Sequence, residues 1–409
     1  MTEVRRTLRK ILAASALIAA AGELSASQWE LILVAEEDTT VVPGTPVTYS
    51  FLDTPAYSAG RVVFYGTHPS SFEGVWEWQD GTLAPVVSSA DLDFRGLPDV
   101  AGSMRTFSAS GTLYTRDGAG PFVTVANTST PVPGGTGNFQ SFRWVATDGT
   151  SVAFAANGPA NGEPTGVYSA PAAGGGPVVK IADLSDGFNS FRRIVSASAG
   201  NLVFMADDIQ QSTTVYRAAT NGSNRITVID RNTPIPLPGI LGTFMAGSLD
   251  DVAPAISGDT VLVYGSGAGI SGLFRKQGTQ ALQPVVTNNT SPPGATDTFV
   301  NFLGMALSGE NVAFVASGFA GSDIPQGIFV ILNGQLEKVI DISQPINGRP
   351  FRNIRFLPKG FEGTSIAFLA FMEGAGNDAI ILARCTDCPS VFSDGFESGN
   401  LSRWLRTPP

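Results

Sequence analysis

The chain has 409 residues, of which 43% are hydrophobic and 15% charged, with 25 basic side chains, 35 acidic ones and a single histidine. This composition excludes a disordered chain, and its 47 glycines and 27 prolines indicate many turns and few exposed helices. The net charge of −10 argues against a nucleic-acid or anionic-membrane partner, because an acidic surface repels polyanions.

The N-terminus has the pattern of a secretory signal peptide over residues 1–27. A basic opening, RRTLRK, precedes the apolar run ILAASALIAAAG and the small-residue sequence SAS. The run is too short to span a bilayer. Removing this segment takes away four basic and two acidic residues and leaves a net charge of −12. We therefore expect an exported bacterial protein, secreted, periplasmic or at the cell surface, without stable membrane insertion.

The next stretch, WELILVAEEDTTVVPGTPVTYSF (29–51), combines a strand with a Pro/Gly-rich connector. The connector returns in altered form as TSTPVPGGTGNFQSF (128–142), NTPIPLPGILGTF (232–244) and NTSPPGATDTF (289–299). Between connectors the sequence alternates short strands with Ser-Gly, Asn-Gly and Gln-Gly turns, which suit hairpins. The connector is expected to lead from the outermost strand of one repeat to the innermost strand of the next.

The second strand of each repeat defines the number of repeats. It recurs at Val62, Met104, Val152, Leu202, Val261, Val312 and Ile366, in steps of 42 to 59 residues. Four strands per unit at this spacing are typical of β-propeller blades. The last repeat, at 365–385, lacks a fourth strand, whereas the N-terminal strand is left over. We therefore predict an all-β, seven-bladed β-propeller over residues 28–385, closed by pairing of residues 29–38 with 379–383.

The repeat unit, TPxPGGTGxF followed by PAxSGxxVAFxA, resembles the tandem repeats of secreted bacterial choice-of-anchor type proteins. The resemblance covers most of the chain after residue 27. It implies export and the repeat fold and adds no catalytic residues. The remaining segment, 386–409, is expected to be a C-terminal tail, and its FSDGFESGNLSRW (392–404) resembles short terminal segments of other exported bacterial proteins.

Four repeats carry arginine directly after the aromatic residue that opens the first strand. These residues are Arg95, Arg143, Arg192 and Arg352. Because the first strand of a blade lines the central channel, they are expected to form a cationic ring that binds an anion or an acidic glycan. The alternative is that each pairs with a connector acid such as Asp93, Asp186 or Asp341 and locks neighbouring blades together.

Other motifs favour structural roles. His68 is expected in a solvated loop. Because it is the only histidine in the sequence, a Ser-His-Asp triad and a histidine-ligated metal site are both disfavoured. GAGISG (267–272) matches a dinucleotide-binding pattern, but a strand follows it where a helix is needed. Acid pairs such as Asp183/Asp186 are expected to cap turns in preference to binding Ca²⁺.

Cys385 and Cys388 form a lone C-x-x-C near the end of the last repeat. In an exported protein this spacing favours a small structural disulfide over a redox or zinc site.

No motif calls for a cofactor or a metal ion. We expect a monomeric, non-catalytic binding or scaffold module whose ligand is a protein or a glycan. The alternative is a polysaccharide-active propeller enzyme, either a glycoside hydrolase or a lyase, because the fold alone supports both roles.

Overall fold

The computed structural model describes residues 27–69, 72–89, 93–94, 96–158, 165–245, 252–374 and 378–388. The proposed signal segment, apart from Ser27, and residues 389–409 of the tail lie outside these residues. The described chain forms two compact units, Glu30–Arg384 and a smaller one made of residues from both chain ends. In the smaller unit, Thr386 N donates to Gln28 O (3.0 Å) and Gln28 N donates to Asp387 Oδ1 (2.7 Å). Cys385 and Cys388 are joined there by a disulfide.

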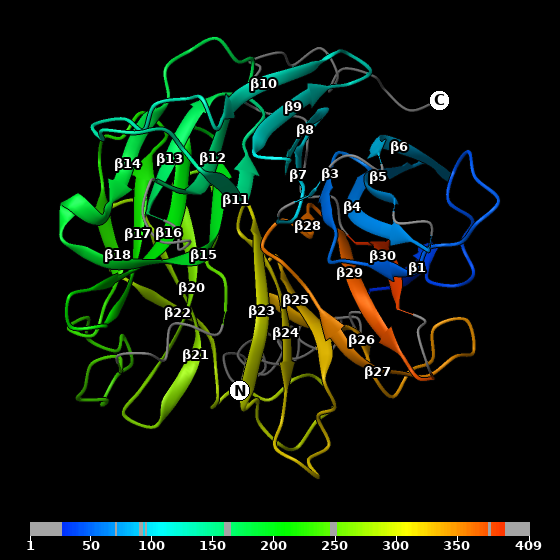
Figure 1. Ribbon diagram of the computed structural model, residues 1–409. Helices are drawn as coiled ribbons and strands as arrows, with labels where there is room; N and C mark the ends of the chain where they lie inside the picture. The colour runs from blue at the N-terminus through cyan, green and yellow to red at the C-terminus, as the bar shows by residue number, and fades with distance from the viewer. Residues whose placement is uncertain are drawn as a thin grey trace, which may run out of the picture. The chain divides into compact units, whose positions relative to one another are not determined.

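The Glu30–Arg384 unit is a seven-bladed β-propeller, as predicted (Figure 1). Each blade is an antiparallel sheet. Its strands follow one another in chain order from the centre of the ring to the outside, except in the last blade. The first three blades are β2(Phe51–Leu52), β3(Ala56–Ser58), β4(Arg61–His68), β5(Phe72–Gln79) and β6(Thr82–Ser89); β7(Asp99–Ala101), β8(Met104–Ala109), β9(Thr112–Asp117) and β10(Phe122–Asn127); and β11(Ser141–Thr147), β12(Ser151–Asn157), β13(Gly166–Pro171) and β14(Val179–Asp183).

The other four blades complete the ring. They are β15(Phe188–Ser198), β16(Asn201–Asp208), β17(Thr213–Ala219) and β18(Ile226–Ile229); β19(Ala255–Ser257), β20(Thr260–Gly267), β21(Ile270–Gln277) and β22(Gln283–Thr287); β23(Asn301–Ser308), β24(Asn311–Ser317), β25(Gly327–Leu332) and β26(Gln335–Asp341); and β27(Phe351–Arg355), β28(Phe361–Glu362), β29(Ser365–Met372), β30(Ala379–Cys385) and β1(Trp29–Glu36). One short 3-10 helix, η1(Leu184–Asp186), lies between the third and fourth blades. All seven second strands contain the residue at which the sequence placed them.

The ring closes as predicted, with β1 as the outer strand of the seventh blade beside β30 (Figure 1). Beyond the ladder, Glu37 N donates to Asp378 O at 3.0 Å. The buried Glu37 carboxylate accepts from Leu52 N (2.8 Å) and Asp378 N (3.2 Å), so it joins the first and seventh blades. Val34 packs in one core with Ile380 and Leu382. Closure removes the exposed sheet edge that an open array of blades would present.

The repeated connector packs an aromatic residue into the blade that follows it. In four blades its aromatic residue is at most 1% exposed and meets an aromatic of the third strand edge-on, with ring centroids 4.8–5.4 Å apart. The four pairs are Tyr49–Trp76, Phe139–Tyr168, Phe244–Phe274 and Phe299–Phe329. The N–H of each connector aromatic donates to a threonine carbonyl nine to eleven residues earlier in the chain, at 3.0–3.3 Å. Edge-to-face pairs add to the burial of apolar area, so the connector helps to hold its blade together.

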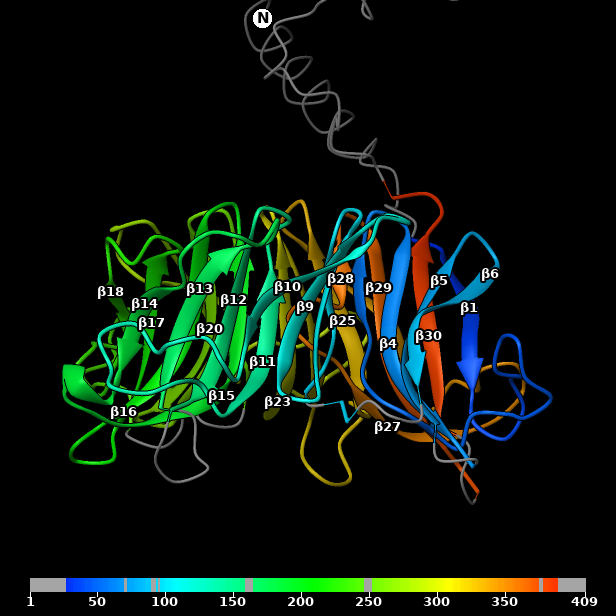
Figure 2. The ribbon, with the colours of Figure 1, turned by 45° about the horizontal axis from the view of Figure 1, so that its top comes forward.

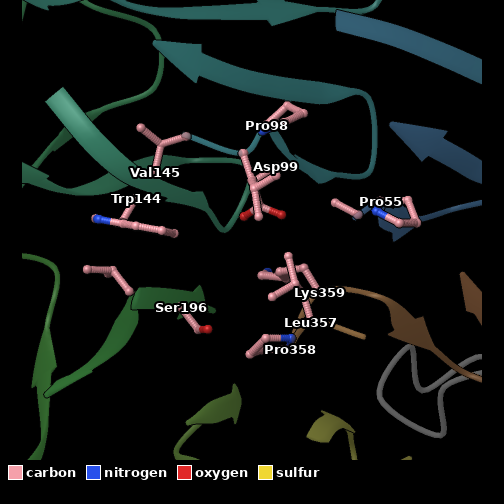
Figure 3. A pocket seen from close by; sticks show the side chains of 12 residues that line it. Pro55, Pro98, Asp99, Trp144, Val145, Ser196, Leu357, Pro358 and Lys359 are labelled. Atoms are coloured by element: carbon pink, nitrogen blue, oxygen red, sulfur yellow. The ribbon is translucent and has the colours of Figure 1, made fainter. Parts of the chain in front are cut away.

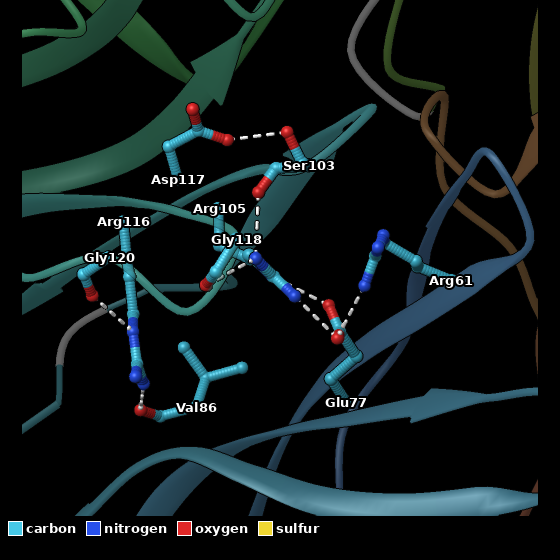
Figure 4. A network of polar contacts seen from close by, with 9 residues as sticks. All are labelled: Arg61, Glu77, Val86, Ser103, Arg105, Arg116, Asp117, Gly118 and Gly120. Atoms are coloured by element: carbon cyan, nitrogen blue, oxygen red, sulfur yellow. Dashed lines mark hydrogen bonds and ion pairs between the residues drawn. The ribbon is translucent and has the colours of Figure 1, made fainter.

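A buried charge network joins the first two blades (Figure 4). Arg105 of β8 is 5% exposed and grips the Glu77 carboxylate of β5 with two nitrogens, one of them at 2.6 Å from Oε2. Its third nitrogen donates to the carbonyls of Ser103 (2.7 Å) and Gly118 (2.8 Å). Arg61 Nη1 also donates to Glu77, at 2.9 Å. Every nitrogen of the buried guanidinium therefore has a partner, and its charge faces a carboxylate, as buried charges require.

The motifs for which the sequence favoured structural roles lie in turns and strands of the blades. GAGISG spans the hairpin between β20 and β21, with Gly267 paired to Ile270. Asp183 caps η1 by accepting from Ser185 N (2.8 Å), and Asp186 pairs with Lys180 and Arg225. The expectation of a solvated His68 is wrong, because His68 ends β4 and is only 6% exposed. His68 pairs with Phe72 of β5 in the ladder, so it belongs to a strand and not to a loop.

Candidate functional site

One mouth of the propeller channel is built from equivalent residues of all seven blades. In each blade the innermost strand ends in a tight turn, and the last residue before this turn lies at the mouth. We call these residues the turn ring: Ser58, Ala101, Asp148, Ser198, Ser257, Ser308 and Glu362. Figure 2 shows the blades side by side, with their strands running between two faces. The turn ring lies on one face and the connectors lie on the other.

The turn ring is a chain of hydrogen bonds from blade to blade. Ser58, Ser198, Ser257 and Ser308 each accept, through Oγ, the N–H of the glycine in the turn of the following blade, at 2.9–3.0 Å. Asp148 does the same with Gly200 N at 2.7 Å, and Glu362 accepts from Ala59 N. Ala101 cannot, and there Gly149 N donates to Thr147 within its own blade at 3.1 Å. Six of the seven blade junctions are thus bridged at the mouth.

All seven members of the turn ring line a cavity of about 400 Å³, which we call the vestibule. Lys359 lines it as well. The carboxylates of Asp148 and Glu362 and the ammonium of Lys359 give the vestibule a net charge of −1 at neutral pH. Burial alone would raise the pKa of Asp148, but hydrogen bonds from the N–H groups of Ser151, Gly200 and Thr150 lower it below its usual range. Asp148 is therefore ionised at neutral pH, and the vestibule attracts cations.

A smaller cavity of about 50 Å³, which we call the waist, adjoins the vestibule and shares Pro358 and Lys359 with it. Prolines that precede inner strands or stand in inner loops form much of its wall: Pro55, Pro98 and Pro358. Trp144 of β11 lies on one side, and Asp99 and Lys359 face each other across the opening (Figure 3). A space of this size holds one or two water-sized groups.

Asp99 is the buried charge of the waist, with 3% of its surface exposed. Its Oδ1 accepts from Val100 N and its Oδ2 from Thr147 N, both at 2.8 Å, so the second bond bridges the blade junction that Ala101 leaves open. Burial raises the pKa of Asp99, whereas the positive charge of Lys359 and the two N–H groups oppose this rise. Lys359 Nζ itself donates to Thr147 O at 3.1 Å, from the seventh blade to the third.

The backbone of Trp144, which also lines the waist, is strained. Its φ of 51° lies in the left-handed region, at the irregularity of β11 between Arg143 and Val145. Its buried indole N–H has no hydrogen-bond partner among the described residues. A left-handed non-glycine residue and an unpaired buried donor each cost about 1–3 kcal/mol, and such costs collect at functional sites. The waist is therefore the strongest candidate for a functional site in the described chain.

The predicted arginine ring is not part of this site. Arg95 lies outside the described residues. Arg143, Arg192 and Arg352 follow Phe142, Phe191 and Phe351 near the start of β11, β15 and β27, whereas the turn ring lies at the other end of the inner strands. Arg192 Nε pairs with Asp207 Oδ2 of the next strand at 3.0 Å. Asp341 pairs with Lys338, at 2.8 Å. Anion binding by these arginines stays a prediction.

Sequence reasoning missed Asp99 and Lys359. A signal was present, because both interrupt the pattern of small or apolar residues in or just before the innermost strands: LPDVAG and LPKGFEG stand where other repeats have TPAYSAG and APAISG. Among the described residues, no three His, Cys, Asp or Glu side chains gather as a metal site would require. No helix of the described chain is long and apolar enough to cross a bilayer.

Solved structures with a similar fold include two peptidases. No protein-family model and no curated protein matches the sequence. A puromycin-hydrolyzing peptidase of Mycobacterium tuberculosis aligns with 78% of this chain and 49% of its own, at 16% identity and a TM-score of 0.49. A prolyl endopeptidase aligns with 82% and 50%, at 12% identity and 0.47. TolB from Acinetobacter baumannii aligns with 57% and 53%, at 16% identity and 0.36. The chain thus spans about half the length of these proteins.

This comparison corrects the functional expectation. We expected a non-catalytic binding or scaffold module, with a polysaccharide-active enzyme as the alternative, but two of these three similar structures are peptidases. The identities are 16% or lower and the TM-scores lie below 0.5, so the β-propeller fold of this chain rests on its own seven sheets. The likeness does not identify a choice-of-anchor protein.

Proposed function

We propose that the chain is the substrate-admitting part of a hydrolytic enzyme that acts on short peptides or similar amides. The observation that carries the proposal is a polar vestibule of about 400 Å³ beside a waist of about 50 Å³, with Pro358 and Lys359 lining both. The strain at Trp144 and the buried charge of Asp99 lie at the waist. The names of the similar peptidases agree with this class of reaction.

The hydrolytic groups would belong to another unit. Both oxygens of Asp99 accept backbone N–H groups, which leaves it poorly suited to remove a proton. The chain's single histidine is buried at the end of β4 and does not line the vestibule or the waist. Nucleophilic hydrolysis needs a nucleophile within hydrogen-bond reach of a base, and the channel offers no such pair among its described residues. Export to the periplasm or beyond is proposed from the signal-like N-terminus.

The test blocks the mouth without breaking its hydrogen bonds. Ala101 lines the vestibule and makes no bond in the turn ring, so Ala101→Trp fills space at little structural cost. Ser129→Trp, at an exposed connector position on the other face, is the matched control. Trialanine should bind the wild type and the control, as measured by calorimetry, and not Ala101→Trp. Extracts of cells that produce Ala101→Trp should hydrolyse trialanine more slowly than extracts with the control. Equal binding or equal hydrolysis would refute the proposal.

A further inference from the structure

We propose that the Asp99 carboxylate and the Thr147 carbonyl form an ammonium-binding subsite in the waist, which Lys359 fills until the amino end of a substrate displaces it. The inference rests on the proposed function and names its substrate class, compounds with a free amino group. It is carried by three observations: the two acceptors, the way Lys359 is attached, and the charges of the vestibule.

The acceptors are fixed before any ligand arrives. Asp99 is held by two backbone N–H groups at 2.8 Å, and one of them belongs to Thr147. The Thr147 carbonyl accepts from an ammonium at 3.1 Å. A buried carboxylate beside a carbonyl suits a cation, and the waist has room for one ammonium-sized group. A bulky or quaternary group would not fit in such a space.

Lys359 has a fixed backbone and a movable ammonium. Its carbonyl accepts from Tyr57 N at 2.7 Å, which ties the loop between β27 and β28 to the first blade. Among the described residues the ammonium makes one hydrogen bond, to Thr147 O, although it has three donors. The residue lines both the waist and the vestibule, so its side chain can swing from one into the other without movement of the backbone. Four rotatable bonds make this motion cheap.

The vestibule favours the exchange electrostatically. When a ligand ammonium takes its place beside Asp99, the Lys359 ammonium moves towards the vestibule, where Glu362 and Asp148 carry carboxylates. Two backbone N–H groups donate to the Asp99 oxygens and favour its ionised form; with Asp99 ionised, the four side chains of Asp99, Asp148, Glu362 and Lys359 carry a charge of −2, which a cationic ligand reduces to −1. Lys359 lies across the waist from Asp99 and hydrogen-bonds Thr147 O, not the carboxylate, so a ligand ammonium that reaches Asp99 adds a direct partner for the buried charge.

The test removes the Lys359 side chain from the subsite and supplies an alkylammonium ion in its place. In Lys359→Ala, n-propylammonium chloride should raise the melting temperature, and sodium chloride at equal ionic strength should not. The rescue should be absent in wild type and in the double variant Asp99→Asn/Lys359→Ala. Trialanine should bind Lys359→Ala about tenfold more tightly than wild type, since no internal competitor remains, and N-acetyl-trialanine should bind neither.

The outcomes separate this inference from the proposed function. Rescue by propylammonium without any peptide binding would keep the subsite and overturn the substrate-admitting role. Peptide binding that is unchanged in Lys359→Ala, or equally strong after N-acetylation, would overturn the displacement. If Lys359→Ala does not fold, the intact protein serves: trialanine should shift the ¹⁵N resonance of the Lys359 ammonium, and N-acetyl-trialanine should leave it in place. An unshifted resonance with bound trialanine would refute the exchange.

Discussion

Replacing single serines of the turn ring by alanine should weaken the propeller in proportion to how deeply each hydroxyl is buried. Each change leaves one backbone N–H of the next blade without its acceptor, at Gly102 for Ser58, Gly258 for Ser198, Gly309 for Ser257 and Gly363 for Ser308. Water in the vestibule can replace part of the lost bond where the serine is half-buried. Ser58 is the exception, with 7% of its surface exposed.

The magnitudes follow from these differences. A net hydrogen bond contributes about 0.5–1.5 kcal/mol, and a donor left unpaired costs about 1–3 kcal/mol. We therefore expect Ser58→Ala to lower the free energy of unfolding by about 1.5 kcal/mol, and Ser198→Ala, Ser257→Ala and Ser308→Ala by about 0.5–1 kcal/mol each. The four together should cost the sum, because they act at separate junctions. The measurement is urea unfolding followed by tryptophan fluorescence.

The matched control is Ser129→Ala, at an exposed connector serine that is not in the ring. It should leave unfolding unchanged. If all four ring variants behaved like this control, the turn ring would be a by-product of the repeat and not a bond between blades. If Ser58→Ala cost no more than Ser308→Ala, burial would not set the size of the effect.

Three further predictions concern the connector, the buried charge network and stability in acid. Phe299→Ala should cost about 3–5 kcal/mol in urea unfolding, since Phe299 is fully buried against Phe329, while Phe299→Leu should cost less. Glu77→Gln should cost about 3–5 kcal/mol because it leaves the Arg105 charge buried without a counter-charge, whereas Arg61→Ala at the exposed side of the network should cost at most about 1 kcal/mol. The lowered pKa of Asp148 means that its contribution to stability is present above about pH 3.9 and is lost as pH falls through the lower folded pKa. Asp148→Asn should therefore flatten the loss of stability in acid; an unchanged acid profile would show that Asp148 does not contribute to it.

The architecture could be predicted from the sequence because its determinants are local and repeated. Glycine turns and alternating apolar residues recur at a spacing of one blade, and the seven second strands follow from them. The closure by β1 followed from counting strands, since one strand was missing at one end and left over at the other. The connector aromatics could be aligned but not placed, because their partners, such as Trp76 for Tyr49, lie on a strand about 27 residues away. Their pairing depends on the fold of the whole blade.

The candidate site could not be predicted in the same way, because its residues depart from the repeat on which the prediction of the fold was based. Residues that recur from blade to blade serve the fold: the four serines of the turn ring bridge neighbouring blades, and the four connector aromatics pack within their own blades. Arginine drew attention because it recurred, yet Arg192 pairs with Asp207 of its own blade. A ligand in the channel meets each blade once, so the groups that discriminate between ligands must differ from blade to blade. Asp99 and Lys359 are such departures, single charges where other blades carry small or apolar residues, and they meet only because the ring brings the second and seventh blades to one axis. In a propeller, the exceptions to the repeat are therefore the residues to test first for function.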